Sequence, residues 1–556
     1  MHPNDQRPFK EGCFDMQEKM KAIGSAVSQS PGKRTGELSP QMMKAGPAKV
    51  TVPVDGQTGV LVIGGGATGA GILWDLSLRG IDAVLVEQRE LAYGTTGRCH
   101  GLLHSGGRYV VRDGDVAREC YQENQILRRV AAGAIEETGG LFVHLKGDDP
   151  DYVMRWTDAA KSAGLPFEEI DLREAYRLEP LLSRDARRAF WVPDAAVDPF
   201  DLVMMNVQGA VECGAKVLTC TRVEKLLVEG QRVRGAVLKD MESGEVYSIN
   251  AEVVINAAGP WAGQVAATAG VHLDLAYGKG TLLIFSQRLS NHVLNRLRPP
   301  GDGDILVPAK TVSLLGTTDL AVPTPENPEP TGEEVSSLLD LGEKLAPGLA
   351  SRRIVRAFAG VRPLYNPGEE AGRQASRGFA VIDHERLHGI SNLYSVVGGK
   401  LTTYRLMAEQ VVDIVAAKLG VSDQCRTKDV CLPSLTAAPT SSTKGAPICE
   451  CELLDKNTLL QAAHHLDRFT PGAFLRSTRL AHGPCQGTTC IYRSALFLYQ
   501  EKLLSYEGCQ EFIKGTLSSR WQGIRHVLQG DQARQLELAR GIYLQNLQLG
   551  DSKNGL

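Results

Sequence analysis

The stretch GVLVIGGGATG, residues 59–69, decides the fold of the chain around it. Residues 59–63 form a short apolar run, which is typical of a buried parallel strand. Glycines at 64, 66 and 69 follow, and residues 67–79 carry small and apolar side chains at helical spacing. A second apolar run at residues 83–87 completes the pattern. The sequence therefore predicts a strand–helix–strand unit of the Rossmann type.

The spacing of these glycines predicts a turn that binds a dinucleotide. Gly64 permits the tight turn, Gly66 lets a pyrophosphate approach the backbone, and Gly69 lets the helix pack closely on the sheet. The helix N-terminus then offers free N–H groups to the phosphates. Glu87, at the end of the second strand, is placed to accept hydrogen bonds from a ribose. A purely structural turn is the alternative, and the fingerprint alone does not separate FAD from NAD.

Two later segments favour FAD. Residues 253–261 read as a strand that ends in small residues, which allow close approach of a flat cofactor. Residues 397–405 form a second glycine turn that enters a helix, whose N-terminus would face a flavin ring. The candidate cofactor-binding residues are Gly64, Gly66, Gly69, Glu87, Gly259, Gly399 and Thr402.

Composition bounds the class of protein. The chain has 556 residues, 43% hydrophobic and 22% charged, with a formal net charge of -3. These values are typical of a soluble globular protein with about two or three structural units, and they give no reason to expect nucleic-acid binding. No window resembles a membrane-spanning helix, and the first residues lack an apolar signal-peptide core. We therefore expect a cytoplasmic protein with at most peripheral membrane contact.

Changes in composition along the chain predict its domains. Residues 1–56 show no sustained periodicity and are expected to be a disordered extension. Residues 57–433 mix strand-like and helix-like runs, and we expect an α/β fold in which a Rossmann-type half is interleaved with a β-rich substrate half. Residues 434–447 read as a linker. A small cysteine-containing domain at 448–505 and a helical tail at 506–556 complete the prediction.

Four cysteines near the C-terminus form the second informative pattern. One residue separates Cys449 from Cys451, and four separate Cys485 from Cys490. In a chain without a secretion signal, cysteines argue for free thiols or metal ligands and not for disulfides. Structural zinc sites space their near pairs by about two to four residues, so the tight first pair favours a [2Fe–2S] cluster. Zinc and unliganded thiols are the alternatives.

Longer motifs carry a resemblance to a known family. They lie at residues 64–71, 101–109, 197–200, 256–261, 316–319, 360–364 and 398–405. Through them the chain resembles FAD-dependent glycerol-3-phosphate dehydrogenases, and most closely the large catalytic subunit, or A-subunit, of the anaerobic branch. The cysteine segment favours that branch and resembles the small bacterioferritin-associated ferredoxin-like domain, which binds a [2Fe–2S] cluster. The linker before the cysteines is shorter, and the N-terminal extension longer, than the family pattern.

The resemblance implies a reaction and a route for the electrons. The substrate would be sn-glycerol 3-phosphate, oxidised to dihydroxyacetone phosphate by hydride transfer to FAD. Electrons would pass through the [2Fe–2S] centre to two partners, which are a second catalytic subunit plus a membrane-associated iron–sulfur subunit, and then to the quinone pool in anaerobic respiration. The complex would lie at the inner face of the cell membrane. The resemblance leaves open whether the complex also binds FMN. The alternative is an FAD-dependent dehydrogenase or oxidase of an amine or another 2-hydroxy acid.

A phosphorylated substrate requires a cationic clamp, and arginine supplies a bidentate fork for phosphate oxygens. Arg108 and Arg362 are the candidates because both lie in glycine-containing motifs. A surface ion pair is the ordinary alternative for an arginine. Similarity to the aerobic enzymes adds Tyr109, Thr317 and Lys400 on the substrate side.

Loss of a hydride from C2 leaves an alcohol proton, so a general base is required. His104 is the first candidate, and a hydrogen bond to cofactor or backbone is its structural alternative. Lys400 is the second, because a desolvated lysine can act as a base or stabilise an alkoxide. The aerobic relatives carry a histidine at the position of Leu282, so that histidine cannot serve in this chain.

Overall fold

The computed structural model describes residues 56–546, apart from 366–377, 436–446, 467 and 529. The expected extension at residues 1–56 lies outside this range except for its last residue. Most of the expected linker at 434–447 also lies outside it.

The predicted strand–helix–strand unit is present and forms the centre of the first sheet. It consists of β1 (Gly56–Ile63), α2 (Ala67–Leu78) and β2 (Ala83–Val86). β1 pairs in parallel with β2 on one side and with β12 (Val246–Asn256) on the other. In the described part of the chain this sheet has eight strands, in the order β10-β11-β12-β1-β2-β9, with β20 beside β12 and β19 beside β20. The remaining strands are β9 (Lys216–Leu218), β10 (Thr221–Glu229), β11 (Arg232–Asp240), β19 (Phe379–Asp383) and β20 (Leu393–Gly398).

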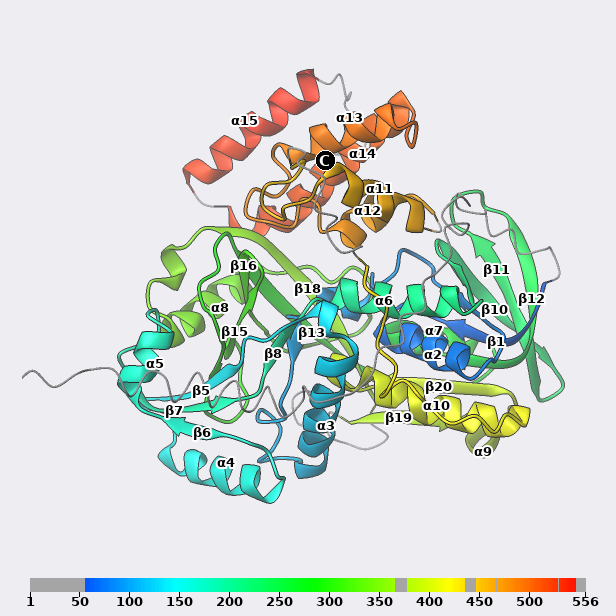
Figure 1. Cartoon of the computed structure of the whole chain (residues 1–556), viewed down its shortest axis with the longest axis horizontal. Coiled ribbons are helices and arrows are strands. Elements are labelled where there is room, and N and C mark those ends of the chain that lie inside the picture. The colour runs from blue at the N-terminus through cyan, green and yellow to red at the C-terminus, as the bar shows by residue number, and fades with distance from the viewer. Residues whose placement is uncertain (1–55, 366–377, 436–446, 467, 529, 547–556) are drawn as a thin grey trace, which may run out of the picture. The chain divides into compact units, whose positions relative to one another are not determined.

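Helices α2, α6 (Pro199–Glu212) and α10 (Tyr404–Leu419) pack against one another beside this sheet (Figure 1). Ile72 and Leu76 of α2 are fully buried in the resulting core. A Cβ at Gly71 would lie 2.8 Å from the ring of Tyr404, so a glycine is needed for α10 to approach α2 this closely. The helix that carries the glycine turn is therefore fixed on two sides.

The second sheet is the β-rich half of the chain. Among the described residues it has nine strands, in the order β17-β13-β16-β15-β14-β5-β7-β6, with β18 on the other edge of β13. Its longest pairing joins β13 (Leu275–Phe285) to β18 (Ile354–Tyr365) in antiparallel register. The other strands are β5 (Gly140–Leu145), β6 (Glu168–Ile170), β7 (Ala186–Val192), β14 (Val293–Arg296), β15 (Ile305–Ala309), β16 (Val312–Gly316) and β17 (Leu320–Val322). Because β5 to β7 precede β9 in the chain, the two sheets are interleaved, as the sequence predicts.

Four helices accompany the second sheet and the connections to it. They are α3 (Gly114–Val130), α4 (Pro150–Ser162), α5 (Leu172–Leu178) and α8 (Gly332–Leu345). Their starts follow from their sequences: the side chain of Asp113 caps α3, and Thr331 forms a capping box with Glu334 at α8. A third, small sheet consists of β3 (Leu102–Leu103), β8 (Ala195–Val197) and β4 (Ile135–Glu136). In the sequence, each of its strands lies between strands of the two larger sheets.

The C-terminal part is helical. We name residues 447–524 the cysteine module. It contains the segment with Cys449 and Cys451, followed by α11 (Lys456–His465), α12 (Pro471–Thr478), α13 (Cys490–Gln500) and α14 (Tyr506–Ile524). Phe474, Leu498 and Phe512 are fully buried in its core. The core therefore extends past residue 505, where the sequence suggests that a separate tail begins, because Phe512 of α14 belongs to it.

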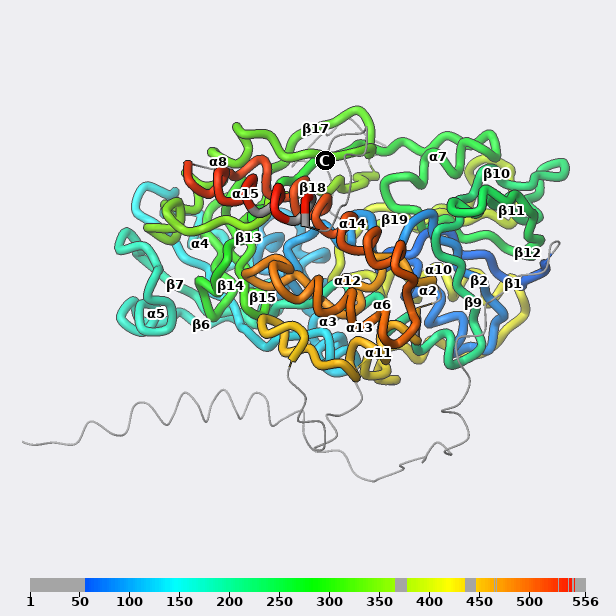
Figure 2. The backbone as a smooth tube through the Cα atoms, turned by 90° about the horizontal axis from the view of Figure 1, so that it is seen from above, coloured from blue at the N-terminus to red at the C-terminus, as the bar shows by residue number. Residues whose placement is uncertain are grey.

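The cysteine module contacts both halves of the chain. Helix α12 contacts α6, and α14 contacts β18 (Figure 2). Helix α15 (Asp531–Asn546) follows it. None of the helices in the described ranges is long and apolar enough to cross a membrane.

Candidate active site

A cavity of about 560 Å³ lies at the carboxyl ends of β1, β2 and β12, where Rossmann-type sheets bind their ligands. We name it the cofactor cavity. The predicted residues Gly64, Gly66, Glu87, Gly259 and Gly399 all line it. Residues far apart in the sequence therefore meet here, as the motif analysis predicts.

The glycine turn has the shape that a pyrophosphate requires. Gly64 has a φ of +110°, and a Cβ there would lie 2.5 Å from the carbonyl oxygen of Ala257. A Cβ at Gly69 would lie 1.9 Å from the carbonyl oxygen of Gly64, which confirms that this glycine allows the helix to start against the turn. Gly66 is the N-cap of α2 and provides no side chain to the cap. The turn thus offers bare backbone at a helix N-terminus, which fits the diphosphate of a dinucleotide.

Glu87 holds the turn from the neighbouring strand. Its carboxylate accepts hydrogen bonds from the backbone N–H of Gly65 at 2.7 Å and of Arg89 at 2.9 Å. Burial raises the pKa of Glu87, and the two N–H donors act in the opposite direction. The side chain lies on the cavity wall, where a ribose hydroxyl would reach it.

The substrate end of the cofactor cavity gathers five of the six residues predicted for catalysis and substrate binding. His104, Tyr109, Thr317, Arg362 and Lys400 line the cavity together. The hydroxyl of Tyr109 lies 3.3 Å from Nε2 of His104, and Nζ of Lys400 lies 4.6 Å from the centre of the Tyr109 ring. A proton acceptor therefore contacts the hydroxyl of Tyr109, and a cation lies over its ring.

Arg362 extends from β18 and has its guanidinium fixed. Nη1 donates to Oδ1 of Asp319 at 2.9 Å, and Nη2 donates to the carbonyl of Thr318 at 3.1 Å and to the hydroxyl of Thr317. The side chain is 26% exposed and lines the cavity. This arrangement orients the planar group before any ligand binds.

Arg108 has a different environment from the one the sequence suggests. It is not among the described residues that line the cofactor cavity. Its Nη2 donates to the carbonyl of Gly301 at 3.0 Å and lies 3.5 Å from Oδ2 of Asp304. The sequence suggests that Arg108 binds the substrate phosphate. In the structure, the carboxylate of Asp304 is the anion beside Arg108.

Thr402 does not line the cofactor cavity, but it contacts a residue that does. It is fully buried, and its hydroxyl accepts a hydrogen bond from the backbone N–H of His104 at 3.1 Å. The second glycine turn therefore positions the histidine loop. The structure brings Thr402 to the site through His104 and not as a cavity-lining residue.

His104 and a second histidine, His100, share a buried corner of the cofactor cavity. Their ring centres are 5.7 Å apart. Burial, together with His100, Arg108 and Lys400, holds the pKa of His104 well below its usual value. Burial and the cations Arg108 and Arg362 lower the pKa of His100 to about 3. Both rings are therefore neutral at pH 7, and His104 can accept a proton.

Sequence reasoning missed His100. Its signal is its place directly before the motif at 101–109, four residues ahead of His104. Nδ1 of His100 is buried and has no hydrogen-bond partner among the described residues. A bound ligand in the cofactor cavity would be the natural partner of this nitrogen.

The four cysteines of the module converge, although their two pairs are 33 residues apart. The thiol of Cys490 interacts with those of Cys449 and Cys485, and the thiol of Cys451 interacts with that of Cys485. A Cβ at Gly483 would lie 2.3 Å from the Cβ of Cys451, so the chain passes this pair very closely. No group of three or more His, Cys, Asp and Glu side chains within the described ranges stands ready to hold a metal ion.

Backbone N–H groups point at two of these sulfurs. The hydrogen bond from Cys490 and the backbone donors of Glu452, Cys451 and Ala481 lower the pKa of Cys449 to about 6. The hydrogen bond from Cys490 and the backbone donors of the 487–488 turn lower the pKa of Cys485 to about 5. Backbone donors therefore favour the thiolate form of Cys449 and Cys485, which is the form of cysteine that binds metals.

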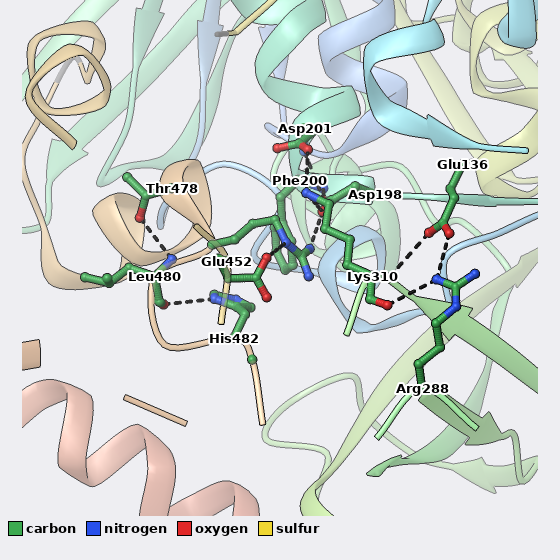
Figure 3. Close-up of polar contacts among 12 residues, drawn as sticks. Glu136, Asp198, Phe200, Asp201, Arg288, Lys310, Glu452, Thr478, Leu480 and His482 are labelled. Atoms are coloured by element: carbon green, nitrogen blue, oxygen red, sulfur yellow. Dashed lines mark hydrogen bonds and ion pairs between the residues drawn. The ribbon is translucent and has the colours of Figure 1, made fainter. Parts of the chain in front are cut away.

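An ion pair network attaches the cysteine module to the first half of the chain (Figure 3). Arg479 pairs with Asp198 and, at 3.1 Å, with Glu452. Asp198 also caps α6 by accepting hydrogen bonds from the backbone of Phe200 and Asp201. The motif at 197–200 therefore has a structural task, because one carboxylate both starts α6 and holds the module.

Comparison with known proteins supports this description. Residues 59–413 match the family described as FAD dependent oxidoreductase. The chain is 41% identical over 534 residues to the A1-subunit of the anaerobic glycerol-3-phosphate dehydrogenase of Haloferax volcanii, covering 87% of this chain and 89% of that protein. It is 40% identical over 518 residues to the A-subunit of the same enzyme from Escherichia coli K12, covering 87% and 96%.

Solved structures with low sequence identity share the fold. The glycerol-3-phosphate dehydrogenase of Bacillus halodurans, complexed with FAD, matches with a TM-score of 0.61 at 22% identity, covering 86% of this chain and 97% of that chain. L-proline dehydrogenase of P. horikoshii matches with a TM-score of 0.55 at 22% identity, covering 68% and 96%. The expected α/β class and the interleaved halves are confirmed. The chain is an FAD-dependent oxidoreductase and belongs to the A-subunit family of anaerobic glycerol-3-phosphate dehydrogenases.

Proposed function

We propose that the chain oxidises sn-glycerol 3-phosphate to dihydroxyacetone phosphate as the catalytic subunit of a quinone-linked complex. Membership of the A-subunit family, at 40% identity over 96% of the Escherichia coli protein, is the observation that carries this proposal. The geometry agrees with it, since an arginine, a lysine and a neutral histidine line one end of a cavity whose other end fits a dinucleotide.

The residues of the substrate end have separate tasks. Bound FAD supplies the acceptor for the hydride that leaves C2 of the substrate. Arg362 and Lys400 bind the phosphate, because both cations line the cavity and Asp319 holds the Arg362 guanidinium in place. His104 takes the proton of the C2 hydroxyl, and Tyr109 holds its ring through the contact at 3.3 Å.

Arg108 has a supporting task in this proposal. Its bonds to Gly301 and Asp304 occupy it outside the cavity lining. Its charge still contributes to the lowered pKa of His104. We therefore assign phosphate binding to Arg362. We assign to Arg108 the task of lowering the pKa of His104, which keeps that histidine neutral.

Cys449, Cys451, Cys485 and Cys490 are proposed to bind a [2Fe–2S] cluster that takes electrons from the flavin. Their convergence and their amide donors support this assignment. The cluster domain then comprises the predicted span 448–505, extended by α14 because Phe512 shares its core. The expected zinc alternative would leave the module colourless and free of sulfide.

Replacement of one thiol tests the cluster independently of turnover. Cys485→Ser should lose iron, acid-labile sulfide and the visible absorption of the cluster, while the flavin content remains. Cys431→Ser is the matched control, because Cys431 is exposed and lies outside the four. Full iron and sulfide in Cys485→Ser, or zinc in place of iron in the wild type, would contradict the assignment.

The two relatives from Haloferax volcanii and Escherichia coli are named as one component of a larger enzyme, and we propose the same setting here. Two partners would take the electrons to quinone: a second catalytic subunit, followed by a membrane-associated iron–sulfur subunit. Those partners would bring the chain to the inner face of the cell membrane. FMN in the complex stays a prediction of the sequence resemblance.

The decisive experiment is anaerobic purification followed by substrate-dependent bleaching of the flavin. Glycerol 3-phosphate should reduce the flavin band near about 450 nm, which is a property of the cofactor, and should yield dihydroxyacetone phosphate. Bleaching by an amino acid or another 2-hydroxy acid, with no response to glycerol 3-phosphate, would establish the alternative reaction on this fold.

A further inference from the structure

A second cavity, of about 440 Å³, lies between the cysteine module and the two sheets. Residues 97–101, β8, α6, β16 and β18 form one side, and α12, α14 and the turn between α12 and α13 form the other. It adjoins the cofactor cavity, because Tyr93, Arg98 and His100 line both. The dinucleotide cradle belongs to the cofactor cavity, so FAD does not account for the second one.

Three arginines from three different elements face this second cavity. Arg98 ends the short helix at Thr95–Arg98, Arg356 extends from β18, and Arg476 extends from α12. The guanidinium carbons of Arg98 and Arg476 lie 4.8 Å and 5.6 Å from the centre of the same ring, that of Tyr93. Arg356 lies near both, since the charges of Arg476 and Arg98 act on it.

Their anionic partners are few. Within the described ranges neither Arg98 nor Arg356 forms an ion pair, and Arg356 donates to the hydroxyl and carbonyl of Ser519 at 3.1 and 3.3 Å. Arg476 pairs with Glu90: its Nη1 lies 3.4 Å from Oε2 of Glu90, and its Nη2 donates to the same oxygen at 3.5 Å. Burial and the charges of Arg476 and Arg98 lower the pKa of Arg356 to about 10, so the cluster is repulsive as it stands.

The opposite end of the second cavity is different in charge. There Lys310 and Arg479 face the carboxylates of Glu136, Asp198 and Asp201, and the groups pair with one another. Arg98 and Arg356, which form no ion pair within the described ranges, therefore leave positive charge at the wall that they share with Arg476. Between the two ends, Val312, Leu314 and Phe358 add apolar surface.

We propose that this second cavity binds a phosphate monoester of a small organic molecule. The phosphate lies against Arg98, Arg356 and Arg476, and the organic part lies on Val312, Leu314 and Phe358. Guanidinium groups from separate elements suit a group with several oxygens, because each oxygen can accept from a different arginine. The volume is in the range of about 300–1,000 Å³ that small-molecule sites occupy. This site is independent of the reaction proposed above.

Equilibrium dialysis of the holoenzyme against radiolabelled inorganic phosphate tests the site. Phosphate at the substrate end should perturb the flavin spectrum, whereas phosphate in the second cavity should bind without changing it. We expect a flavin-silent site in the wild type. Arg356→Met should weaken that site at least about tenfold, because it removes charge-assisted hydrogen bonds. Arg356→Lys should retain part of the affinity.

Two further comparisons define the ligand and the control. Phenyl phosphate should bind the flavin-silent site more tightly than inorganic phosphate, and phenol should not bind it. Arg188→Met, which removes an exposed arginine paired with Glu169 outside both cavities, should leave the site unchanged. Equal affinity for phosphate and phenyl phosphate would overturn the organic part of the proposal. A wild-type holoenzyme without a flavin-silent phosphate site would overturn the whole of it, whatever the variants show.

Discussion

His104 shows how one residue acquires its chemistry from its neighbours. A histidine in water changes charge near neutral pH, but here burial and three nearby cationic or imidazole groups oppose protonation. The contact with Tyr109 and the backbone bond to Thr402 fix the ring and its loop. The residue is therefore ready to accept a proton across the physiological pH range.

His104→Gln should lower kcat/KM for glycerol 3-phosphate by about 10²–10⁴-fold, because it removes the proton acceptor. Since the pKa of His104 is lowered, the acid limb of the wild-type pH profile should lie below the ordinary histidine value. Lys400→Met removes one of the cations that lower this pKa, so the remaining activity should show its acid limb at higher pH. A wild-type limb at or above the ordinary value would remove His104 from the role of base.

Replacement by lysine distinguishes the role of Arg362 from that of Arg108. Arg362→Lys should lower kcat/KM about 10–100-fold, since lysine cannot reproduce the fork held by Asp319 and Thr318. Arg108→Lys keeps a charge beside Asp304 and should stay within about threefold of the wild type. Steady-state kinetics of both variants decide the matter, and a larger loss in Arg108→Lys than in Arg362→Lys would reverse the assignment.

At the level of elements, the start of α2 determines whether the cofactor can bind. Gly64, Gly66 and Gly69 keep Cβ atoms away from the turn, and α10 holds the helix from the other side through the contact at Gly71. The helix N-terminus then lies at the carboxyl ends of parallel strands, which is the place where phosphates bind in this class of fold.

Gly69→Ala should abolish or strongly reduce flavin binding and destabilise the protein by about 1–3 kcal/mol or more. Its Cβ would meet the carbonyl oxygen of Gly64 at 1.9 Å, and neither backbone can move without opening the turn. Gly114→Ala is the control, because a Cβ there has open space at the first turn of α3. The ratio of flavin to protein absorbance and the thermal midpoint measure both effects; full flavin content in Gly69→Ala would contradict this account.

On the scale of the whole molecule, the contact between the cysteine module and the first half of the chain is the decisive feature. Arg479 is 12% exposed, and its partners Asp198 and Glu452 are 6% and 4% exposed. These groups are buried on both sides, so loss of the arginine leaves Glu452 without its cation and leaves Asp198 with Lys310 at 3.8 Å. Breaking such buried pairs costs about 3–5 kcal/mol.

Arg479→Met should therefore loosen the cysteine module while the flavin site stays intact. Flavin reduction by glycerol 3-phosphate, followed by stopped flow, should be unchanged, and electron transfer to an external acceptor through the module should fall. Calorimetry should show a separate unfolding transition for the module at lower temperature. Arg493→Met is the matched control, since its pair with Glu450 is 44% and 55% exposed and contributes little. A single, unshifted transition in Arg479→Met would show that other contacts hold the module.

Much of the architecture can be predicted from the sequence because local patterns specify it. The apolar run at 59–63 is buried on both faces and reads as a parallel strand without reference to distant residues. The same holds for the glycine turn and for Glu87. The pairing of Arg108 could not be predicted from a local pattern, because its partner Asp304 lies 196 residues later in the chain.

The sequence by itself determined the Rossmann unit, the interleaved second sheet, the family and several of the residues that line the cofactor cavity. These features depend on spacing within short motifs, where each residue type has one physical task. Only the tertiary structure decided that Arg108 pairs with Asp304, that His100 joins His104, that α14 belongs to the cysteine module, and that Arg98, Arg356 and Arg476 line a second cavity. Each of these depends on side chains from distant segments meeting in space, and their charges and burial have no signature in local sequence.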